Sequence, residues 1–193
     1  MDNNNNLKMW KSDIKDWTKL DLHAADFYIS QAEKRLKETN DTYNISSVRT
    51  NSYLNVTITL LSICLGYIFT GSIMYLKTVS FFAIIPLLFS VYYLWQNLKS
   101  NTIYTSGDVP KAIFTSKFVD EHTGTEQYLA LTKYTMETIQ YKIEQNRIVN
   151  LCRIKNNKYI RIAIILTPII ALVGATIYLH FFDFHLAWIC QYQ

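Results

Sequence analysis

Three long apolar stretches limit what this sequence of 193 residues can fold into. The last, residues 159–182, reads YIRIAIILTPIIALVGATIYLHFF and holds Arg161 as its one charged residue, while residues 53–76 and 79–98 hold none. A helix of about 20 apolar residues, rising about 1.5 Å per residue, crosses the roughly 30 Å of hydrocarbon in a bilayer. We therefore predict three transmembrane helices, the first two joined by a tight turn at residues 77–78.

The composition favours an all-helical fold. Half of the residues are apolar and 15% are aromatic, with five glycines and three prolines, and such a chain suits helices better than sheets, barrels or disorder. We predict an all-α integral membrane protein whose three transmembrane helices carry long cytoplasmic helical extensions that pack as a bundle. The predicted segments are a cytoplasmic amphipathic helix (1–52), a transmembrane hairpin (53–98), a cytoplasmic loop and helix (99–158), a third transmembrane helix (159–182) and an extracytoplasmic tail (183–193).

The basic residues beside the apolar stretches predict an orientation, because cytoplasmic segments carry an excess of Lys and Arg near the span ends. Basic residues gather before the first span, after the second and before the third, namely Lys34, Arg35, Lys37, Arg49, Lys99, Arg147, Arg153, Lys155, Lys158 and Arg161. The short turn has Lys77 alone, and the tail after Phe182 has no Lys or Arg. We therefore predict a cytoplasmic amino terminus and an external carboxyl terminus. The clustered bases are more typical of contact with anionic lipid headgroups than with nucleic acid.

Segments outside the apolar stretches also show helical patterns. Apolar residues of 8–40 recur at three- and four-residue steps between charges, which predicts an amphipathic helix that packs on a partner helix or lies on the membrane surface. Residues 40–52 are rich in Asn, Ser and Thr, and they predict a turn or a loosely wound entry to the first span. Residues 125–161 contain no Pro or Gly, so we expect one helix to continue from them into the last span.

A heptad register in this last helix combines apolar and polar residues. One face carries Leu129, Met136, Ile139 and Ile143 and continues as Asn146, Asn150 and Asn157. Polar residues at the core positions of a helical bundle can set the register and the number of helices that associate. The pattern indicates either a partly hydrated bundle interior or a face toward a solvated cavity or a small ligand.

Two stripes of small or hydroxyl residues lie on the spans. Asn55, Thr59, Ser62, Gly66 and Thr70 share one face of the first span, and Ala163, Thr167, Ala171 and Ala175 recur at every fourth residue of the last. Small residues at this spacing let helices approach closely, and hydroxyls can bond across the contact. Both stripes therefore indicate packing within the chain or between subunits. The first stripe is also consistent with a lining for ions once several copies assemble.

No enzyme motif accompanies these helices. The sequence lacks a phosphate-binding Gly-rich loop, a His-Glu-x-x-His pair, a Gly-x-Ser-x-Gly turn and paired cysteine motifs, and no carboxylate interrupts the apolar stretches. The tail brings His180, Asp183, His185 and Cys190 close together in sequence, but their spacing matches no closed zinc site. We predict a protein that is not an enzyme and that holds no metal or cofactor. The irregular stretch 99–124 is a candidate loop for contact with a ligand or a partner.

The order of these parts resembles the small membrane effectors of bacterial conflict systems, namely the SLATT group and the three-span effectors of Pycsar-type systems. The resemblance is carried by an amphipathic helix reading ADFYISQAEKRLKETNDTYN (25–44), by the hairpin of spans that follows, and by a cytoplasmic helix that leads into a third span, EQYLALTKYTMETIQYKIEQNRIVNLCRIKNNKYIRIAIIL (126–166). It covers most of the chain by layout.

The resemblance implies a membrane effector of a bacterial antiphage signalling system, located in the inner (plasma) membrane. A cyclic nucleotide or a partner protein would reorganise the cytoplasmic helices, drive or open a homo-oligomer and depolarise the membrane. The candidate residues for sensing are Arg147, Asn150, Arg153 and Lys155, whose polar groups suit a phosphate. The other interpretation of these bases is that they set the membrane topology and contact lipid headgroups. A non-enzymatic scaffold or accessory subunit of a larger membrane complex explains the same features, and neither function involves nucleic acid.

Overall fold

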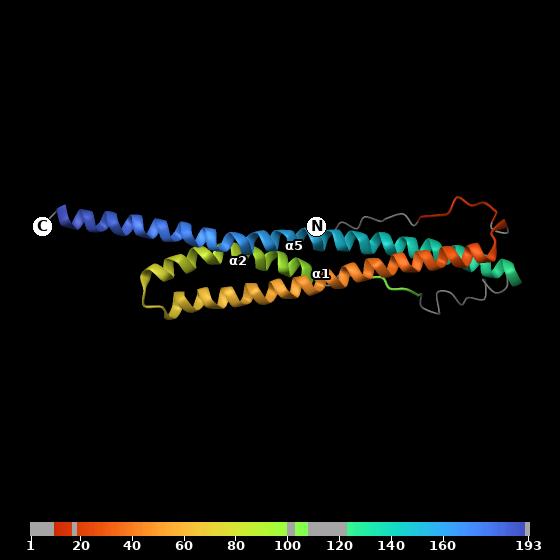
Figure 1. The fold of residues 1–193 in the computed structure, drawn as a ribbon, viewed down its shortest axis with the longest axis horizontal. Helices are drawn as coiled ribbons and strands as arrows, with labels where there is room; N and C mark the ends of the chain where they lie inside the picture. The colour runs from red at the N-terminus through yellow and green to blue at the C-terminus, as the bar shows by residue number, and fades with distance from the viewer. Residues whose placement is uncertain (1–9, 17–18, 100–102, 108–122, 192–193) are drawn as a thin grey trace. The chain divides into compact units, whose positions relative to one another are not determined.

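The described part of the chain forms three helices. The structure, a computed structural model, describes residues 10–16, 19–99, 103–107 and 123–191, and residues 182–191 by their backbone alone. The helices are α1 (Leu22–Thr70), α2 (Met74–Leu98) and α5 (Gly124–Gln191), and none of the described residues forms a strand (Figure 1). The all-helical prediction is confirmed. Each helix contains a segment that is long and apolar enough to cross a membrane.

Helix α1 begins later than the amphipathic helix that is predicted over residues 8–40. It begins at Leu22 rather than near residue 8, and residues 10–16 and 19–21 are not α-helical. The Asp21 carboxylate accepts a hydrogen bond from the backbone N–H of Ala24 at 3.2 Å, as an N-cap residue does. The segment before it is held elsewhere, since the backbone N–H of Ser12 donates to the Glu137 carboxylate of α5 at 3.0 Å.

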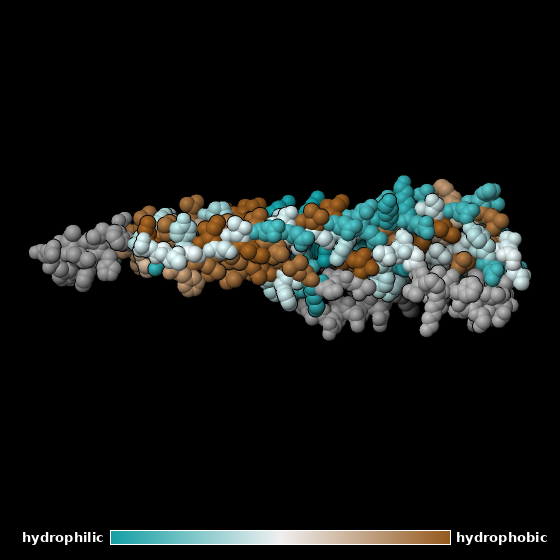
Figure 2. Space-filling model, turned by 90° about the horizontal axis from the view of Figure 1, so that it is seen from below, coloured by the Kyte–Doolittle hydropathy of each residue, from teal (hydrophilic) through white to brown (hydrophobic). Residues whose placement is uncertain are grey.

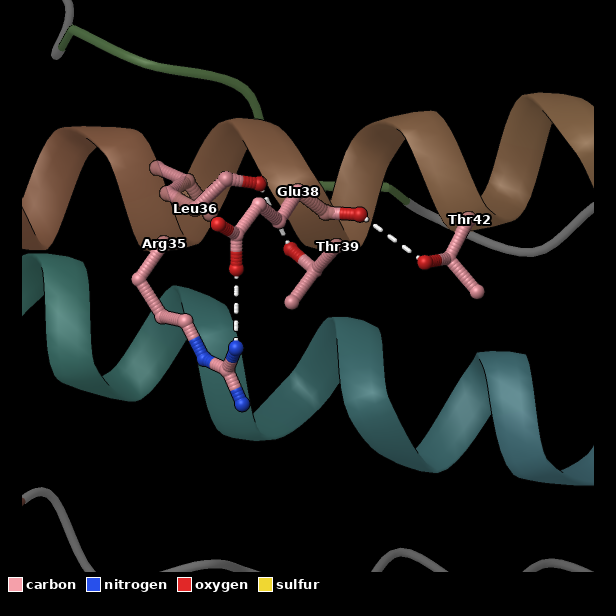
Figure 3. Close-up of polar contacts among 5 residues, drawn as sticks. All are labelled: Arg35, Leu36, Glu38, Thr39 and Thr42. Carbon is pink, nitrogen blue, oxygen red and sulfur yellow. Dashed lines mark hydrogen bonds and ion pairs between the residues drawn. The ribbon is translucent and has the colours of Figure 1, made fainter.

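The turn predicted at residues 40–52 is wrong, because α1 continues through them without a break. Hydroxyl groups in this stretch bond to the carbonyl oxygens of the preceding turn, so they do not compete with the helix. Figure 3 shows the Thr42 hydroxyl donating to the Glu38 carbonyl at 2.9 Å, beside the ion pair of Arg35 and Glu38. The Thr50 hydroxyl likewise donates to the Ser46 carbonyl at 2.9 Å.

The loop between α1 and α2 lies at residues 71–73, and the turn predicted at 77–78 is helical. Gly71 explains the position of the break. Its N–H donates to the Tyr67 carbonyl at 3.1 Å, and a β-carbon on Gly71 would lie 2.4 Å from that same oxygen. Only glycine therefore fits where the chain leaves α1, and α2 then folds back beside it (Figure 1).

Helix α5 joins residues 125–158 and the last apolar stretch in one element, as the sequence predicts. It begins at Gly124, whose φ of 56° is in the left-handed region, and it runs through 159–182 to Gln191. The helix therefore also includes most of the predicted tail, of which only the backbone is described.

The chain forms two compact units, which we describe separately. Unit 1 comprises residues 1–45 and 101–151, and unit 2 comprises residues 46–100 and 152–193. In unit 1, the Tyr128 hydroxyl of α5 donates to the Asp26 carboxylate of α1, and the Asn146 amide donates to Asn40 at 3.0 Å. Later residues of α1 thus meet later residues of α5, so the two helices run parallel in this unit.

The buried side chains of the helices recur with a period of 3.5 residues. On α5, every seventh residue is buried from one end of the described packing to the other: Thr132, Ile139, Asn146, Arg153, Ile160, Thr167 and Gly174. On α2 the buried residues other than Pro86 follow steps of three and four: Ser80, Ala83, Leu87, Ser90, Leu94 and Asn97. This period is that of coiled-coil packing, in which each side chain enters a gap between four residues of the neighbouring helix.

In unit 2, α2 runs antiparallel to α5, and two aromatic pairs join them near the ends of the apolar region. Tyr93 contacts Tyr159 with ring centroids 4.9 Å apart, and Tyr75 contacts Tyr178 at 5.5 Å. At about 1.5 Å per residue, the two pairs are about 27 Å apart along α2 and about 29 Å apart along α5, close to the thickness of a bilayer's hydrocarbon core. On the face shown in Figure 2, apolar residues gather on the coloured surface of unit 2, with residues of intermediate hydropathy between them.

Candidate functional site

The stripe predicted on the first span lies on the exposed side of α1. All five of its residues are exposed: Asn55, Thr59, Ser62, Gly66 and Thr70. The side of α1 that packs in unit 2 carries Tyr53, Thr57 and Leu60, of which Thr57 is fully buried. With 3.6 residues per turn, the stripe points about 150° away from this packed side. No described segment of unit 2 covers the stripe.

The stripe differs in chemistry from the rest of the exposed surface in the apolar segments. The Thr59 hydroxyl donates to the Asn55 carbonyl at 2.9 Å and the Thr70 hydroxyl to the Gly66 carbonyl at 2.7 Å, whereas the Asn55 side chain carries an exposed amide. On α2 and α5 the exposed surface is instead built mainly from large apolar residues, including Phe81, Ile85, Leu88, Phe89, Ile165, Ile169, Leu172 and Phe181. Lipid chains suit the second surface better than the first.

The second predicted stripe lies inside unit 2. Ala163, Thr167 and Ala175 are buried, and Ala171 is half-buried. The adjacent Gly174 shows how closely α2 approaches, because a β-carbon there would lie 2.6 Å from the ring and 2.9 Å from the β-carbon of Phe82. The buried members of the stripe therefore serve packing within one chain, and Gly174 beside them lets α5 approach α2 closely.

A buried layer of polar side chains crosses unit 2 at one end of the apolar region. We call it the polar layer, and it consists of Ser46, Thr50, Asn97, Arg153, Asn156 and Asn157. The Asn97 amide donates to Asn157 Oδ1 at 2.8 Å. The Thr50 hydroxyl lies 3.0 Å from the same oxygen and shares its single proton between this oxygen and the Ser46 carbonyl. The Asn157 amide donates to Ser46 Oγ at 3.1 Å, and the Asn156 amide donates to Asn97 Oδ1 at 2.9 Å. All three helices are thus tied together at one level.

Arg153 extends this layer to the carboxyl end of α2. One guanidinium nitrogen donates to the backbone carbonyl of Asn97 at 2.8 Å, and the other donates to the Ser47 hydroxyl at 2.6 Å. The Asn97 carbonyl belongs to the last turn of α2, where carbonyls have no partner within the helix and the helix dipole favours a cation. The buried Arg153 therefore caps α2 and links it to α1.

The four residues considered for sensing have different surroundings. Asn150 is buried, and its amide donates to the Thr39 carbonyl at 2.8 Å; Arg153 is buried in the polar layer. Arg147 and Lys155 are exposed. Asn150 and Arg153 are used in packing. An added phosphate could therefore reach only Arg147 in unit 1 and Lys155 in unit 2 among these four residues. The three asparagines at 146, 150 and 157 face the interior, as the bundle interpretation predicts.

In unit 1, Asn146 anchors the connector that follows α2. Its side chain accepts from the Tyr104 N–H at 3.0 Å and donates to the Tyr104 carbonyl at 2.8 Å. Lys142 Nζ donates to the Gly107 carbonyl at 2.6 Å, and Gly107 has a φ of 82° that favours glycine. The start of the predicted ligand loop is therefore fixed to α5. Residues 108–122 of that loop lie outside the described part of the chain.

Two tyrosines of unit 1 have perturbed acidity. The hydrogen bond to the Asp26 carboxylate raises the pKa of Tyr128, because ionisation would break the bond and place two negative charges together. Burial, followed by the neighbouring Tyr141, raises the pKa of Tyr104. Among the described residues, no group of three or more His, Cys, Asp or Glu side chains is arranged to hold a metal. The side chains of Asp183, His185 and Cys190 are not among them.

The contributions of α1 and α2 to the polar layer are not predicted from the sequence. Asn97 lies seven residues after Ser90 and three after Leu94. This heptad spacing indicates that Asn97 shares the buried face of α2. Ser46 and Thr50 were assigned to a turn, so their place on a packed helix face was not recognised.

Comparison of the chain with protein-family models, with curated proteins and with solved structures finds no match.

Proposed function

We propose that this protein is a homo-oligomeric membrane effector of a bacterial antiphage signalling system. It assembles through α1 and depolarises the inner membrane when its cytoplasmic helices sense a nucleotide second messenger or a partner protein. Its amino terminus is cytoplasmic and its carboxyl terminus lies outside. The resemblance in layout to SLATT and Pycsar-type effectors supports this proposal.

The observation that carries the proposal is the exposed polar stripe of α1. Asn55, Thr59 and Ser62 lie on a helix segment apolar enough to cross a membrane, and they face away from the other helices of unit 2. The Thr59 hydroxyl is already bonded to the Asn55 carbonyl of its own helix, but an exposed amide such as that of Asn55 would raise the free energy of the protein if it faced hydrocarbon without a partner. A second copy of α1 offers matching hydroxyl and amide groups, and a ring of such copies would enclose them around a hydrated path.

The sensing step requires cytoplasmic basic residues whose side chains are not used in packing. Arg147 is exposed on the part of α5 that belongs to unit 1, and its planar guanidinium suits a phosphate. The same helix continues into the last span, so a ligand that changes its packing acts on a membrane-crossing element. A cyclic nucleotide is the ligand class that the resemblance implies.

The test is the membrane potential of bacteria that express the protein from a tightly controlled promoter, followed with a voltage-sensitive dye. We expect the wild type to depolarise the cells and the double variant Asn55→Leu, Thr59→Leu to leave them polarised. The matched control is Thr176→Leu, since Thr176 is also an exposed threonine of a span and its hydroxyl donates to its own helix, at Val173, over 2.9 Å. That control should depolarise like the wild type.

Chemical crosslinking in the same membranes reports on assembly. We expect oligomers of the wild type and of the Thr176→Leu variant, and mainly monomers of the double variant. If the cells keep their potential even when candidate cyclic nucleotides are raised, the effector proposal is wrong. The alternative is then a scaffold or accessory subunit of a larger membrane complex, in which the stripe would contact a different protein.

A further inference from the structure

The polar layer fixes the relative level of basic residues that are far apart in the sequence. Because Thr50, Asn97 and Asn157 are joined by hydrogen bonds, the residues next to them on the three helices lie near one level. Arg49 precedes Thr50, Lys99 follows Asn97 by two residues, and Lys155 and Lys158 flank Asn157. All four basic side chains are exposed. Arg161, also exposed, lies about 6 Å farther along α5.

The two units differ in their balance of basic and acidic residues. Unit 1 contains twelve Lys and Arg and fourteen Asp and Glu, whereas unit 2 contains seven Lys and Arg and only one acidic residue, Asp183. Six of the seven basic residues of unit 2 lie at the end that holds the polar layer, and Lys77 alone lies at the other. Surface lysines in soluble helices usually alternate with acidic residues. Here the described part of unit 2 offers no carboxylate to neutralise them.

Aromatic residues place these charges at the edge of the apolar region. Tyr93 and Tyr159 meet just beyond the polar layer, and Trp95 of α2 is 71% exposed between Tyr93 and Asn97. Tyr and Trp collect at the boundary between hydrocarbon and headgroups, and the second aromatic pair lies one hydrocarbon thickness away. The cations are therefore at the depth of lipid phosphates, and Arg161 can extend its apolar stem toward that depth.

We propose that Arg49, Lys99, Lys155, Lys158 and Arg161 form a basic belt that binds the phosphate groups of anionic phospholipids. The belt surrounds the three helices where they leave the hydrocarbon, and the buried polar layer holds its members in register. Lipid phosphates supply the negative charge that unit 2 lacks. This inference depends on membrane insertion of unit 2 and not on pore formation or signalling.

The test uses the full-length protein with Trp95 as its one tryptophan, the other three being replaced by phenylalanine. The protein is reconstituted in phosphatidylcholine vesicles that contain either brominated phosphatidylglycerol or brominated phosphatidylcholine, both of which quench tryptophan on contact. Competition between the two lipids gives their relative affinity at the belt. We expect at least a fivefold preference for phosphatidylglycerol at low salt, and a loss of preference at 0.5 M salt because screening weakens the attraction.

The informative variant is Lys155→Gln, Lys158→Gln, and the matched control is Lys77→Gln at the opposite end of the same unit. Each basic residue near an anionic surface contributes about a fivefold change in affinity, so the double variant should lose the preference and the control should keep it. Unchanged helical circular dichroism verifies folding in both. Equal quenching by the two lipids in the wild type, or equal behaviour of the two variants, would overturn the proposal. Displacement of the lipid by soluble glycerol phosphate would overturn it too, since the belt would then bind free phosphates.

Discussion

The side-chain amide of Asn97 donates a 2.8 Å hydrogen bond to Asn157 Oδ1, and this contact joins the last turn of α2 to the middle of α5. Asn97 is 1% exposed and Asn157 8%, so water cannot readily replace either partner. Polar residues at core positions reduce the number of registers in which helices can pack, because any shift leaves buried groups without partners. The pair therefore selects one register for a bundle whose apolar positions alone would permit several.

Replacement of Asn97 by alanine should destabilise unit 2 by about 2 kcal/mol, because buried Asn157 and half-buried Asn156 would each lose a hydrogen bond with the Asn97 side chain. The measurement is unfolding of the protein in detergent micelles, followed by circular dichroism. The control is Asn51→Ala, an exposed asparagine of α1 whose loss should change stability by less than about 0.5 kcal/mol. Equal effects of the two changes would show that the polar layer does not stabilise the bundle.

Gly174→Ala and Gly66→Ala should have opposite effects. Alanine at 174 would meet the Phe82 side chain, including its β-carbon at 2.9 Å, so ring rotation alone cannot relieve the contact. Gly66 has nothing within 4 Å of an added β-carbon in the single chain, so alanine there improves helix propensity in the monomer. We expect the two free energies of unfolding to differ by about 1–3 kcal/mol in favour of Gly66→Ala. A Gly174→Ala protein as stable as Gly66→Ala would contradict the close approach of α2 and α5.

Arg153→Met should be much more harmful than Arg147→Met. Arg153 supplies hydrogen bonds from a charged group to α1 and to the end of α2, and their loss should destabilise the protein by about 2–3 kcal/mol. Arg147 is exposed, so its replacement should leave stability within about 0.5 kcal/mol of the wild type. Thermal unfolding in micelles gives both values.

The two arginines also separate folding from sensing in the cellular assay. If Arg147 contacts the activating phosphate, Arg147→Met should abolish depolarisation while the protein unfolds at the normal temperature. A loss of depolarisation in Arg153→Met would follow from lost stability and would carry no information about ligand binding. Normal depolarisation by Arg147→Met would remove that residue from the proposed sensing step.

The Tyr128–Asp26 hydrogen bond should make unit 1 sensitive to alkaline pH. This bond raises the pKa of Tyr128 in the folded protein above its ordinary value of 10.0. The stabilisation is therefore fully present below pH 10 and is lost as the pH rises through the raised pKa. Tyr128→Phe should be less stable than the wild type at pH 8, and the difference should shrink by pH 11.5. Unfolding in urea at the two pH values measures this, and a constant difference would contradict the assignment.

Much of the architecture could be predicted from the sequence because it depends on local patterns. The apolar stretches ending near Leu98 and beginning at Tyr159 set the number and approximate place of the membrane-length helices, since length and hydropathy are properties of the residues themselves. The heptad spacing of Asn146, Asn150 and Asn157 correctly indicated an interior face. The stripe of α1 was recognised for the same reason, because residues four apart share a helix face in any context.

Tertiary structure decided what these faces meet. Residues 40–52 have compositions that favour turns, but packing against α5 and hydroxyl bonds to the preceding carbonyls keep them helical, and the break occurs instead at Gly71, where a β-carbon does not fit. Asn97, Thr50 and Asn157 are far apart in sequence, and only the antiparallel return of α2 joins them. Spacing along a helix determines which residues share a face, but the burial of Arg153 and the exposure of Asn55 depend on which neighbours the fold supplies.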